Sequence, residues 1–450
     1  MPSSYYDPLI NSTPASQPFA DSYWASTESL PALLPSLKSS QQTDVAIIGG
    51  GYTGLLTAYY LATEFNIDCR VLEANQVGFG ASARNAGFVL KGSGRLGYSA
   101  MAKRWDLATA QGIYQEFSQA VSRVEGLINQ HQIACEPQEH GYLKVAHNPK
   151  ALNSLKAAAD FIQQNMAQDS DFTAQFISAD KFKNQYLNHH QAYGALRLND
   201  GFGVNPLKLL LGYKSLVQKQ GISINEQSCV VDWIEENGKH RLLTEHGELL
   251  ANKVIMAGNA YSPKQFNQRV DDKFLPILSN IIVTEPLTDN ELAQAGLHTN
   301  QVTMDTRILK YYFRLLPDNR LLFGGRGAVW GKDAAEPIYG QRLKLAMDKC
   351  FPYLSRKKIA YNWTGWIAAS MDDMPHVYSK NGVGYSLGYC GAGVSFSAQA
   401  AFRLAQSIAG ESLPDLPLYN APLPAMPFTK ARRIGQWGYY HYGWLKDKFG

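Results

Sequence analysis

The sequence has few cysteines and few charged residues for its length. Its 450 residues include five cysteines, an odd number, and no two of them are spaced as CxxC. A disulfide framework and a cysteine-rich zinc site are therefore not expected, whereas a reducing compartment is. The ten histidines show no metal-ligand spacing such as HExxH, so the sequence predicts no metal site. Charged residues make up 18% of the chain, below the usual ~25% of soluble proteins.

Long apolar segments are also missing. No stretch approaches the roughly 18–20 consecutive apolar residues that span a bilayer. The first residues contain no basic stretch followed by an apolar run, which is the pattern of a secretory signal. We therefore expect a cytoplasmic protein.

The net charge is small and comes from one end of the chain. There are 42 Lys and Arg against 38 Asp and Glu, a net charge of +4. Residues 430–450 contain five basic residues and one acidic residue, Asp447, and so account for that whole charge. The rest of the chain is neutral, so the sequence predicts no nucleic-acid partner.

The residues that are present indicate a folded protein with an extended start. Hydrophobic residues make up 45% of the chain, which excludes wholesale disorder. At ~100–200 residues per domain, the length suggests about two to four compact units. Residues 1–43 are rich in Pro, Ser and Thr and show no periodicity, so we interpret them as an extended arm whose aromatic residues pack on the body.

A dinucleotide-binding pattern follows the arm. Residues 45–48 are an apolar strand, three glycines and a helical pattern come next, and residues 69–72 form a second strand. Gly49 permits a tight turn, Gly51 lets the backbone approach a pyrophosphate, and Gly54 lets helix and sheet pack closely. Glu73, at the end of the second strand, is placed to accept hydrogen bonds from ribose hydroxyls. An acidic residue here disfavours NADP but leaves NAD and FAD open.

Further segments resemble one flavoenzyme family. Residues 77–87 (VGFGASARNAG) follow Glu73 closely, and residues 388–394 (GYCGAGV) precede a C-terminal helix. Together with the first motif and with residues 23–26, 204–208, 254–261, 305–307, 312–314 and 323–326, they resemble the FAD-dependent D-amino-acid oxidase/glycine oxidase superfamily. The similarity is greatest to its gamma-glutamylputrescine oxidoreductase branch.

The resemblance implies an α/β fold with two interleaved lobes. One is a Rossmann-type FAD-binding lobe over residues 44–135, 195–270 and 360–412. The other is an α+β substrate lobe over residues 136–194 and 271–359, built on an antiparallel-rich sheet. Residues 413–450 form a Pro-rich and then basic, aromatic tail.

The resemblance also implies noncovalent FAD and a set of cofactor-binding residues. Covalent members attach flavin through Cys or His, but here the corresponding Cys position falls near Gly365 and Trp366, and residues 82–87 contain no His. The expected cofactor-binding residues are Gly49, Gly51, Tyr52, Thr53, Gly54, Glu73, Ala74, Gly80, Ala81, Ser82, Arg84, Asn85, Ala86, Gly87, Val230, Gly258, Cys390, Gly391, Ala392, Gly393 and Val394.

The implied activity is oxidation of the C–N bond of an amine or amino acid, with hydride transfer to flavin, hydrolysis of the imine, and oxygen or another electron acceptor. A gamma-glutamylputrescine-like amine is favoured, and an amino-acid or N-methyl-amino-acid dehydrogenase or deaminase of the same fold, passing electrons to a membrane acceptor, is the alternative. Tyr312 is expected to orient substrate, and Arg314 and Arg326 to bind a carboxylate unless they are structural partners of acids. Trp366 is either an aromatic wall of the site or a core residue.

Two features allow more than one interpretation. Cys390 is expected to be a small buried turn residue rather than a nucleophile, because no neighbouring His or Lys would lower its pKa. The tail either folds over its own FAD-binding lobe or docks on a partner or membrane through residues 430–450. A flavin-containing binding protein that docks through its arm and tail is therefore the hypothesis of another class.

Overall fold

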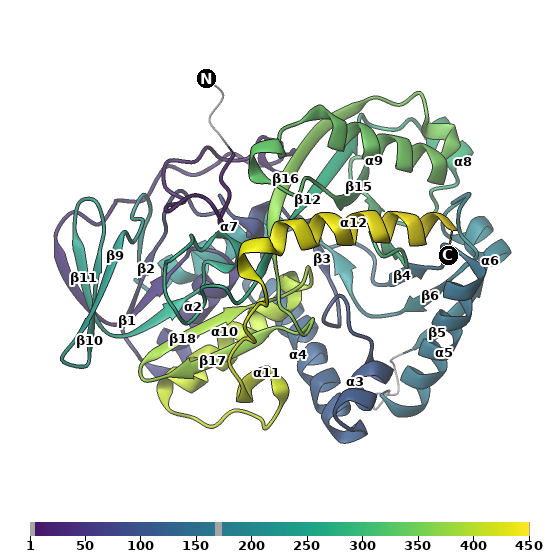
Figure 1. Cartoon of the computed structure of the whole chain (residues 1–450). Helices are drawn as coiled ribbons and strands as arrows, with labels where there is room; N and C mark the ends of the chain where they lie inside the picture. Colours follow the sequence, from purple (N-terminus) through teal and green to yellow (C-terminus); the bar gives the residue numbers. More distant parts are fainter. Residues whose placement is uncertain (1–4, 167–172, 450) are drawn as a thin grey trace.

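The computed structural model describes residues 5–166 and 173–449. The first four residues of the expected arm, six residues of the expected substrate lobe and the last residue of the tail lie outside this part. The described chain contains two large sheets side by side, with helices packed on both and the last helix lying across the front (Figure 1).

The first sheet is mostly parallel and begins with the predicted strand–turn–helix–strand unit. Its strand order is β17-β18-β11-β1-β2-β8, and β9 and β10 extend it from β11. β17 and the β9–β10 pair are antiparallel to their neighbours. The strands are β1 (Ser40–Ile48), β2 (Cys69–Leu72), β8 (Ser223–Asn225), β9 (Asp232–Glu236), β10 (Lys239–Leu243), β11 (Glu248–Met256), β17 (His376–Lys380) and β18 (Val383–Leu387).

Helices pack on this sheet because its central strands are apolar on both faces. Val45, Ala46 and Ile47 of β1 are fully buried, as expected for an interior parallel strand. The helices that contact its strands include α2 (Tyr52–Phe65), α7 (Pro206–Lys219) and α10 (Gly393–Ala409), while α4 (Leu107–His131) packs on α10 and α3 (Tyr98–Arg104) packs on α4. α10 ends at Gly410, whose φ of +92° fits the predicted glycine stop.

The second sheet is antiparallel except where β4 pairs with β13. Its order is β16-β12-β15-β14-β13-β4-β6-β5. The strands are β4 (Tyr142–Val145), β5 (Ala174–Ser178), β6 (Gly194–Leu198), β12 (Leu275–Thr284), β13 (Val302–Asp305), β14 (Tyr312–Leu315), β15 (Leu321–Arg326) and β16 (Ile359–Ala369). Its helices are α5 (Pro149–Asn165), α6 (Ala179–Gln185), α8 (Asp289–Ala295) and α9 (Pro337–Cys350).

Two strands lie in a different lobe from the one expected. All but the first residue of β6 and of β16 falls within residues 195–270 and 360–412, which were assigned to the FAD-binding lobe, yet both strands belong to the second sheet. The reason is pairing: β16 runs beside β12 from Leu275↔Ala369 to Thr284↔Ile359, and β6 lies between β4 and β5. The lobe boundaries therefore shift at these two places.

The arm and the tail both lie on the body. In the described part of the arm, α1 (Tyr23–Ser26) is short, and Trp24 is buried with its indole N–H donating to the Asn85 carbonyl at 2.8 Å. β1 starts at Ser40, inside the expected arm. β3 (Phe88–Val89) and β7 (Phe202–Gly203) form a small ladder, and α11 (Pro417–Asn420) and α12 (Arg432–Phe449) form the tail. None of the described helices has the length and hydropathy needed to cross a membrane.

Candidate active site

A single cavity runs between the two sheets and collects most of the predicted site residues. From the first sheet it is lined by the β1–α2 turn, the end of β2 and the turn around residues 78–86. From the second sheet it is lined by residues of β12, β14, β15 and β16, and the loop before α10 completes it. The elongated, two-sided lining can hold a dinucleotide with a substrate at one end.

The glycine turn after β1 has the geometry of a pyrophosphate cradle. Gly49 has a φ of +113°, and a Cβ on Gly54 would lie 1.9 Å from the Gly49 carbonyl oxygen. The N-cap of α2, Gly51, supplies no side-chain acceptor, and the first turn contains no acidic residue. The positive end of α2 is therefore open to an anionic group, while Ser82 Oγ accepts the Tyr52 N–H at 3.0 Å.

Glu73 lies beside this turn and lines the cavity. Its two carboxylate oxygens accept the N–H groups of Gly50 at 2.7 Å and Asn75 at 3.0 Å. Burial raises the pKa of Glu73, against the opposite effect of these N–H donors. The carboxylate thus fixes the glycine turn, and its expected contact with a ribose stays a prediction.

Most of residues 77–87 line the cavity, but the polar side chains of this segment form hydrogen bonds within the protein. Arg84 donates to the Phe79 carbonyl at 2.6 Å and to the Thr364 carbonyl of β16 at 3.3 Å. The Asn85 amide bonds to the main chain of Ala81, Ser82 and Gly87. Arg84 and Asn85 thus line the cavity while their polar groups hold the turn together.

Most predicted cofactor-binding residues line the cavity, and three do not. Gly54, Gly87 and Ala392 lie outside the lining. Gly87 has a φ of +72°, and a Cβ there would lie 1.9 Å from the Val204 carbonyl oxygen, so its role is close packing. The predicted cofactor-binding residues that line the cavity are Gly49, Gly51, Tyr52, Thr53, Glu73, Ala74, Gly80, Ala81, Ser82, Arg84, Asn85, Ala86, Val230, Gly258, Cys390, Gly391, Gly393 and Val394.

Arg314 was expected at the substrate site, and the structure corrects this. Its buried guanidinium donates to the carbonyls of Ala86 at 3.1 Å and Val204 at 2.6 Å, and to the Gln138 side chain. Burial lowers the pKa of Arg314 to about 9. Its donors are used within the protein, and the cavity lining does not include it. Its partners are carbonyl and amide oxygens rather than acids.

The substrate end is formed by the second sheet. Tyr312 lines the cavity, its hydroxyl lies 2.7 Å from Ser279 Oγ, and burial raises its pKa to about 12. Trp366 is a buried core residue and also lines the cavity. Its indole N–H donates to the Tyr6 carbonyl at 2.8 Å. Arg326 also lines the cavity, and its guanidinium has no hydrogen-bond or ion-pair partner among the described residues.

Two further cations line this end that sequence reasoning missed. Lys310 Nζ donates to the Gly94 carbonyl at 2.6 Å, and burial together with the nearby cations Lys144, Arg326 and Arg95 lowers the pKa of Lys310 to about 7. Arg95 donates to the Tyr439 hydroxyl at 2.7 Å. Residues two apart on an extended strand share a face, so the prediction for Tyr312 could have been extended to Lys310. Nothing in the sequence indicates that Arg95 lies at the site.

The loop before α10 is strained, and it is tied to α2. Cys390 has a φ of +52° and lies between Gly388 and Gly391, which also have positive φ. The thiol is buried, and burial raises its pKa, which supports the expected turn role rather than a nucleophile. Tyr389 of this loop places its hydroxyl 2.7 Å from Thr53 Oγ1. Cys390, Gly391 and the first residues of α10 line the cavity, so the positive end of that helix lies beside it.

Comparison with known proteins decides which dinucleotide this cavity holds. The family model described as FAD dependent oxidoreductase matches residues 44–407. The chain belongs to this family. Since the glycine turn, Glu73 and the α10 loop fit such a cofactor, the predictions of an enzyme and of FAD are confirmed.

Relatives and solved structures agree with this family. The chain is 30% identical to gamma-glutamylputrescine oxidoreductase of Escherichia coli over 418 residues, covering 91% of this chain and 95% of the relative. It is 30% identical to the probable oxidoreductase OrdL of Haemophilus influenzae, covering 88% and 90%. Glycine oxidase from Geobacillus kaustophilus has the same fold, with a TM-score of 0.69 at 17% identity over 83% of this chain and 96% of that one.

Proposed function

We propose that this FAD-dependent oxidoreductase oxidises the C–N bond of a primary or secondary amine that carries a carboxylate, with a gamma-glutamylputrescine-like amine favoured. The observation that carries the proposal is the charge at the substrate end of the cavity. Arg326, Lys310 and Arg95 line the cavity together with Tyr312 and Trp366, and Glu73 is the one carboxylate among the described lining residues.

Arg326 and Lys310 pair with no carboxylate among the described residues, whereas Arg95 forms an ion pair with Asp373 at 3.3 Å, so the excess positive charge here favours an anionic ligand. The mutual repulsion of these cations is part of what lowers the pKa of Lys310. Arg326 supports this most directly, because its planar guanidinium can bind a carboxylate through two parallel hydrogen bonds. A carboxylate at this end would relieve the repulsion and fix one end of the substrate.

The remaining residues position the substrate and keep it from water. Bound FAD supplies the acceptor for a hydride from the carbon that bears the amine, and water then hydrolyses the imine. The Ser279–Tyr312 hydrogen bond holds the phenol in the cavity, and a pKa of about 12 keeps it protonated, which suits a hydrogen-bonding rather than a basic role. Trp366 adds a rigid apolar wall.

The same cation group also suits the α-carboxylate of a free amino acid or an N-methyl amino acid. This second candidate is supported by the fold shared with glycine oxidase and by the L-amino acid deaminase of Proteus vulgaris, whose TM-score is 0.66 at 18% identity over 89% of this chain and 96% of that one. The two candidates differ in the distance between carboxylate and reacting amine.

Anaerobic bleaching of the flavin by a panel of amines tests the proposal. We expect gamma-glutamylputrescine to bleach faster at low concentration than putrescine, which has no carboxylate. Re-admission of air then separates an oxidase from a dehydrogenase. Preference for putrescine would contradict the carboxylate requirement, and preference for free amino acids would favour the second candidate.

A variant at Arg326 tests the residue itself. Arg326→Gln should raise KM for a carboxylate-bearing amine by about tenfold or more, because a charge-assisted hydrogen bond contributes roughly 1.5–3 kcal/mol. The exposed Arg356→Gln variant is the matched control. An unchanged KM in Arg326→Gln would remove this residue from the site.

A further inference from the structure

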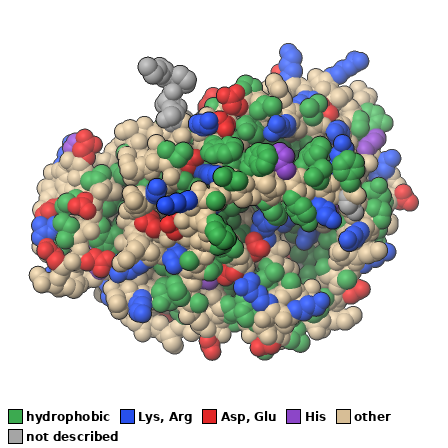
Figure 2. All heavy atoms as spheres, in the orientation of Figure 1, with side chains coloured by type: hydrophobic (Ala, Val, Ile, Leu, Met, Phe, Trp, Pro, Cys, Tyr) green, Lys and Arg blue, Asp and Glu red, His purple; other side chains and the backbone are tan. Residues whose placement is uncertain are grey.

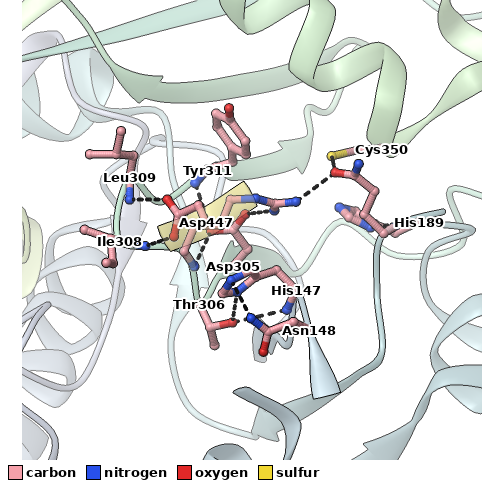
Figure 3. A network of polar contacts seen from close by, with 12 residues as sticks. His147, Asn148, His189, Asp305, Thr306, Ile308, Leu309, Tyr311, Cys350 and Asp447 are labelled. Atoms are coloured by element: carbon pink, nitrogen blue, oxygen red, sulfur yellow. Dashed lines mark hydrogen bonds and ion pairs between the residues drawn. The ribbon is translucent and has the colours of Figure 1, made fainter. Parts of the chain in front are cut away.

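The C-terminal helix α12 is bound to the protein by a polar stripe. Its inward residues are spaced three or four apart: Arg433, Gln436, Tyr440, Gly443 and Asp447. Arg433 donates to Asp7 at 2.7 Å and to the carbonyls of Val329 and Pro276. The Asp447 carboxylate accepts the N–H groups of Ile308 at 2.7 Å and Leu309 at 2.9 Å (Figure 3).

Because the polar stripe faces inward, the apolar side chains of the tail face outward. Eight of the eighteen exposed large hydrophobic residues of the described chain fall within residues 428–449. Figure 2 shows hydrophobic side chains gathered along the position that α12 has in Figure 1. They are Phe428, Ile434, Trp437, Tyr439, Tyr442, Trp444, Leu445 and Phe449. We call these residues the outer aromatic face.

Within the tail, the exposed charged side chains beside the outer aromatic face are basic. Lys430, Lys446 and Lys448 are exposed or partly exposed and pair with no carboxylate among the described residues. Asp447, the one acid of the tail, is turned inward. Lys448 also lies over the Trp444 ring at 5.0 Å. A ligand for this face must therefore tolerate aromatic side chains and lack positive charge.

We propose that α12 docks the enzyme on an anionic lipid surface. Trp and Tyr rings settle at the level of lipid headgroups, and flanking lysines attract anionic lipids. A second copy of the chain fits less well, because a symmetric contact through this face would bring lysines of both copies together without an acid between them. This inference rests on the tail alone and does not depend on which amine is oxidised.

Docking through α12 would bring the lipid surface close to the cavity. Tyr439 accepts a hydrogen bond from Arg95, and Tyr440 packs against the cluster of Ile277, Ala369 and Cys390. Arg95 and Cys390 line the cavity. Asp447 holds the main chain directly before Lys310. The helix that meets the lipid thus contacts the wall of the substrate end.

Flotation of the purified holoenzyme with vesicles tests this proposal. We expect flotation with vesicles of phosphatidylcholine and phosphatidylglycerol and much less with phosphatidylcholine alone. Trp437→Ser/Trp444→Ser should weaken partitioning by about tenfold or more, since two interfacial aromatics are lost. Lys446→Gln/Lys448→Gln should weaken binding to the anionic vesicles and reduce its dependence on salt.

Matched surface variants and a folding check make the result decisive. Leu345→Ser/Tyr353→Ser removes two exposed hydrophobic residues elsewhere, and Lys183→Gln/Lys219→Gln removes two exposed lysines. All variants should keep wild-type flavin absorbance and Tm. The proposal is overturned if wild type does not float, if the tryptophan pair floats like wild type, or if those variants instead split a dimer of the wild-type protein.

Discussion

At the residue scale, the Glu73 carboxylate has an observed structural role and an expected role in binding the cofactor. It holds the Gly50 and Asn75 N–H groups and is expected to contact the ribose. Glu73→Ala should therefore weaken FAD binding by about tenfold or more, because charge-assisted hydrogen bonds are lost. Titration of the apoprotein with FAD measures this, with the exposed Glu285→Ala as control. Equal affinity in wild type and Glu73→Ala would remove the ribose assignment.

Lys310 should make ligand binding depend on pH. Its pKa is lowered to about 7, so its positive charge is present below that pH and is lost as the pH rises through it. Binding of a carboxylate without an amine, such as glutarate, should therefore weaken by roughly tenfold between about pH 6 and 8. The change in flavin absorbance on binding measures Kd.

Replacement of Lys310 shows whether the pH dependence of binding comes from this lysine or from titration of the ligand. Lys310→Met should bind glutarate weakly at every pH, with a flat profile, whereas the exposed Lys219→Met should follow wild type. A flat profile in the wild-type enzyme would show that Lys310 does not meet the carboxylate.

At the scale of elements, the β1–α2 turn can pack as it does only because Gly54 has no side chain. Gly54→Ala places a methyl group 1.9 Å from the Gly49 carbonyl oxygen, so the strand and helix must separate. We expect a loss of about 2 kcal/mol or more in stability together with loss of FAD. Thermal unfolding and flavin content measure both effects.

An open glycine in another helix is the control for this substitution. Gly126 of α4 is exposed, and a Cβ there meets nothing within 4 Å. Gly126→Ala should stabilise the protein by about 0.5–1 kcal/mol, because alanine has less freedom to lose on folding. A Gly54→Ala variant as stable as Gly126→Ala would contradict the close packing in the turn.

The end of α12 is held by one carboxylate. Asp447→Ala removes the acceptor of two N–H groups, so the last turns of the helix should open more often. We expect faster proteolytic cleavage within residues 430–449 and an unchanged rate in Asp160→Ala, which alters an exposed acid of α5. Equal cleavage rates would mean that the other inward contacts suffice.

Local rules predicted some parts of the site and could not predict others. The turn around Gly49 and the stop at Gly410 follow from backbone geometry that only a few residues permit, so the sequence marks them. Arg314 and Lys310 are both basic residues in or near one strand, but only tertiary packing decides that Lys310 lines the cavity and Arg314 does not. The pairing of β16 with β12 is equally nonlocal.

At the scale of the whole molecule, the two sheets share the cavity and should unfold together. The chain crosses between them repeatedly, and FAD would contact residues of both. Calorimetry of the holoenzyme should show one transition. Relative to the apoprotein, free FAD at about 100 times its Kd should raise the free energy of unfolding by about 2.7 kcal/mol. Two resolved transitions, with only one moved by FAD, would contradict this coupling.

The ion pair between Asp7 and Arg433 has a consequence for the two ends of the chain. Asp7 also accepts the Gly331 N–H at 2.8 Å, so the start of the chain is anchored where the last helix begins. A short deletion that removes Asp7, or a fusion partner that displaces it, would leave a buried guanidinium without its carboxylate. An alteration at the first residues should therefore loosen the last helix, although more than four hundred residues separate them. The segment around Asp7 and the helix α12 should therefore loosen together, whichever of the two is disturbed.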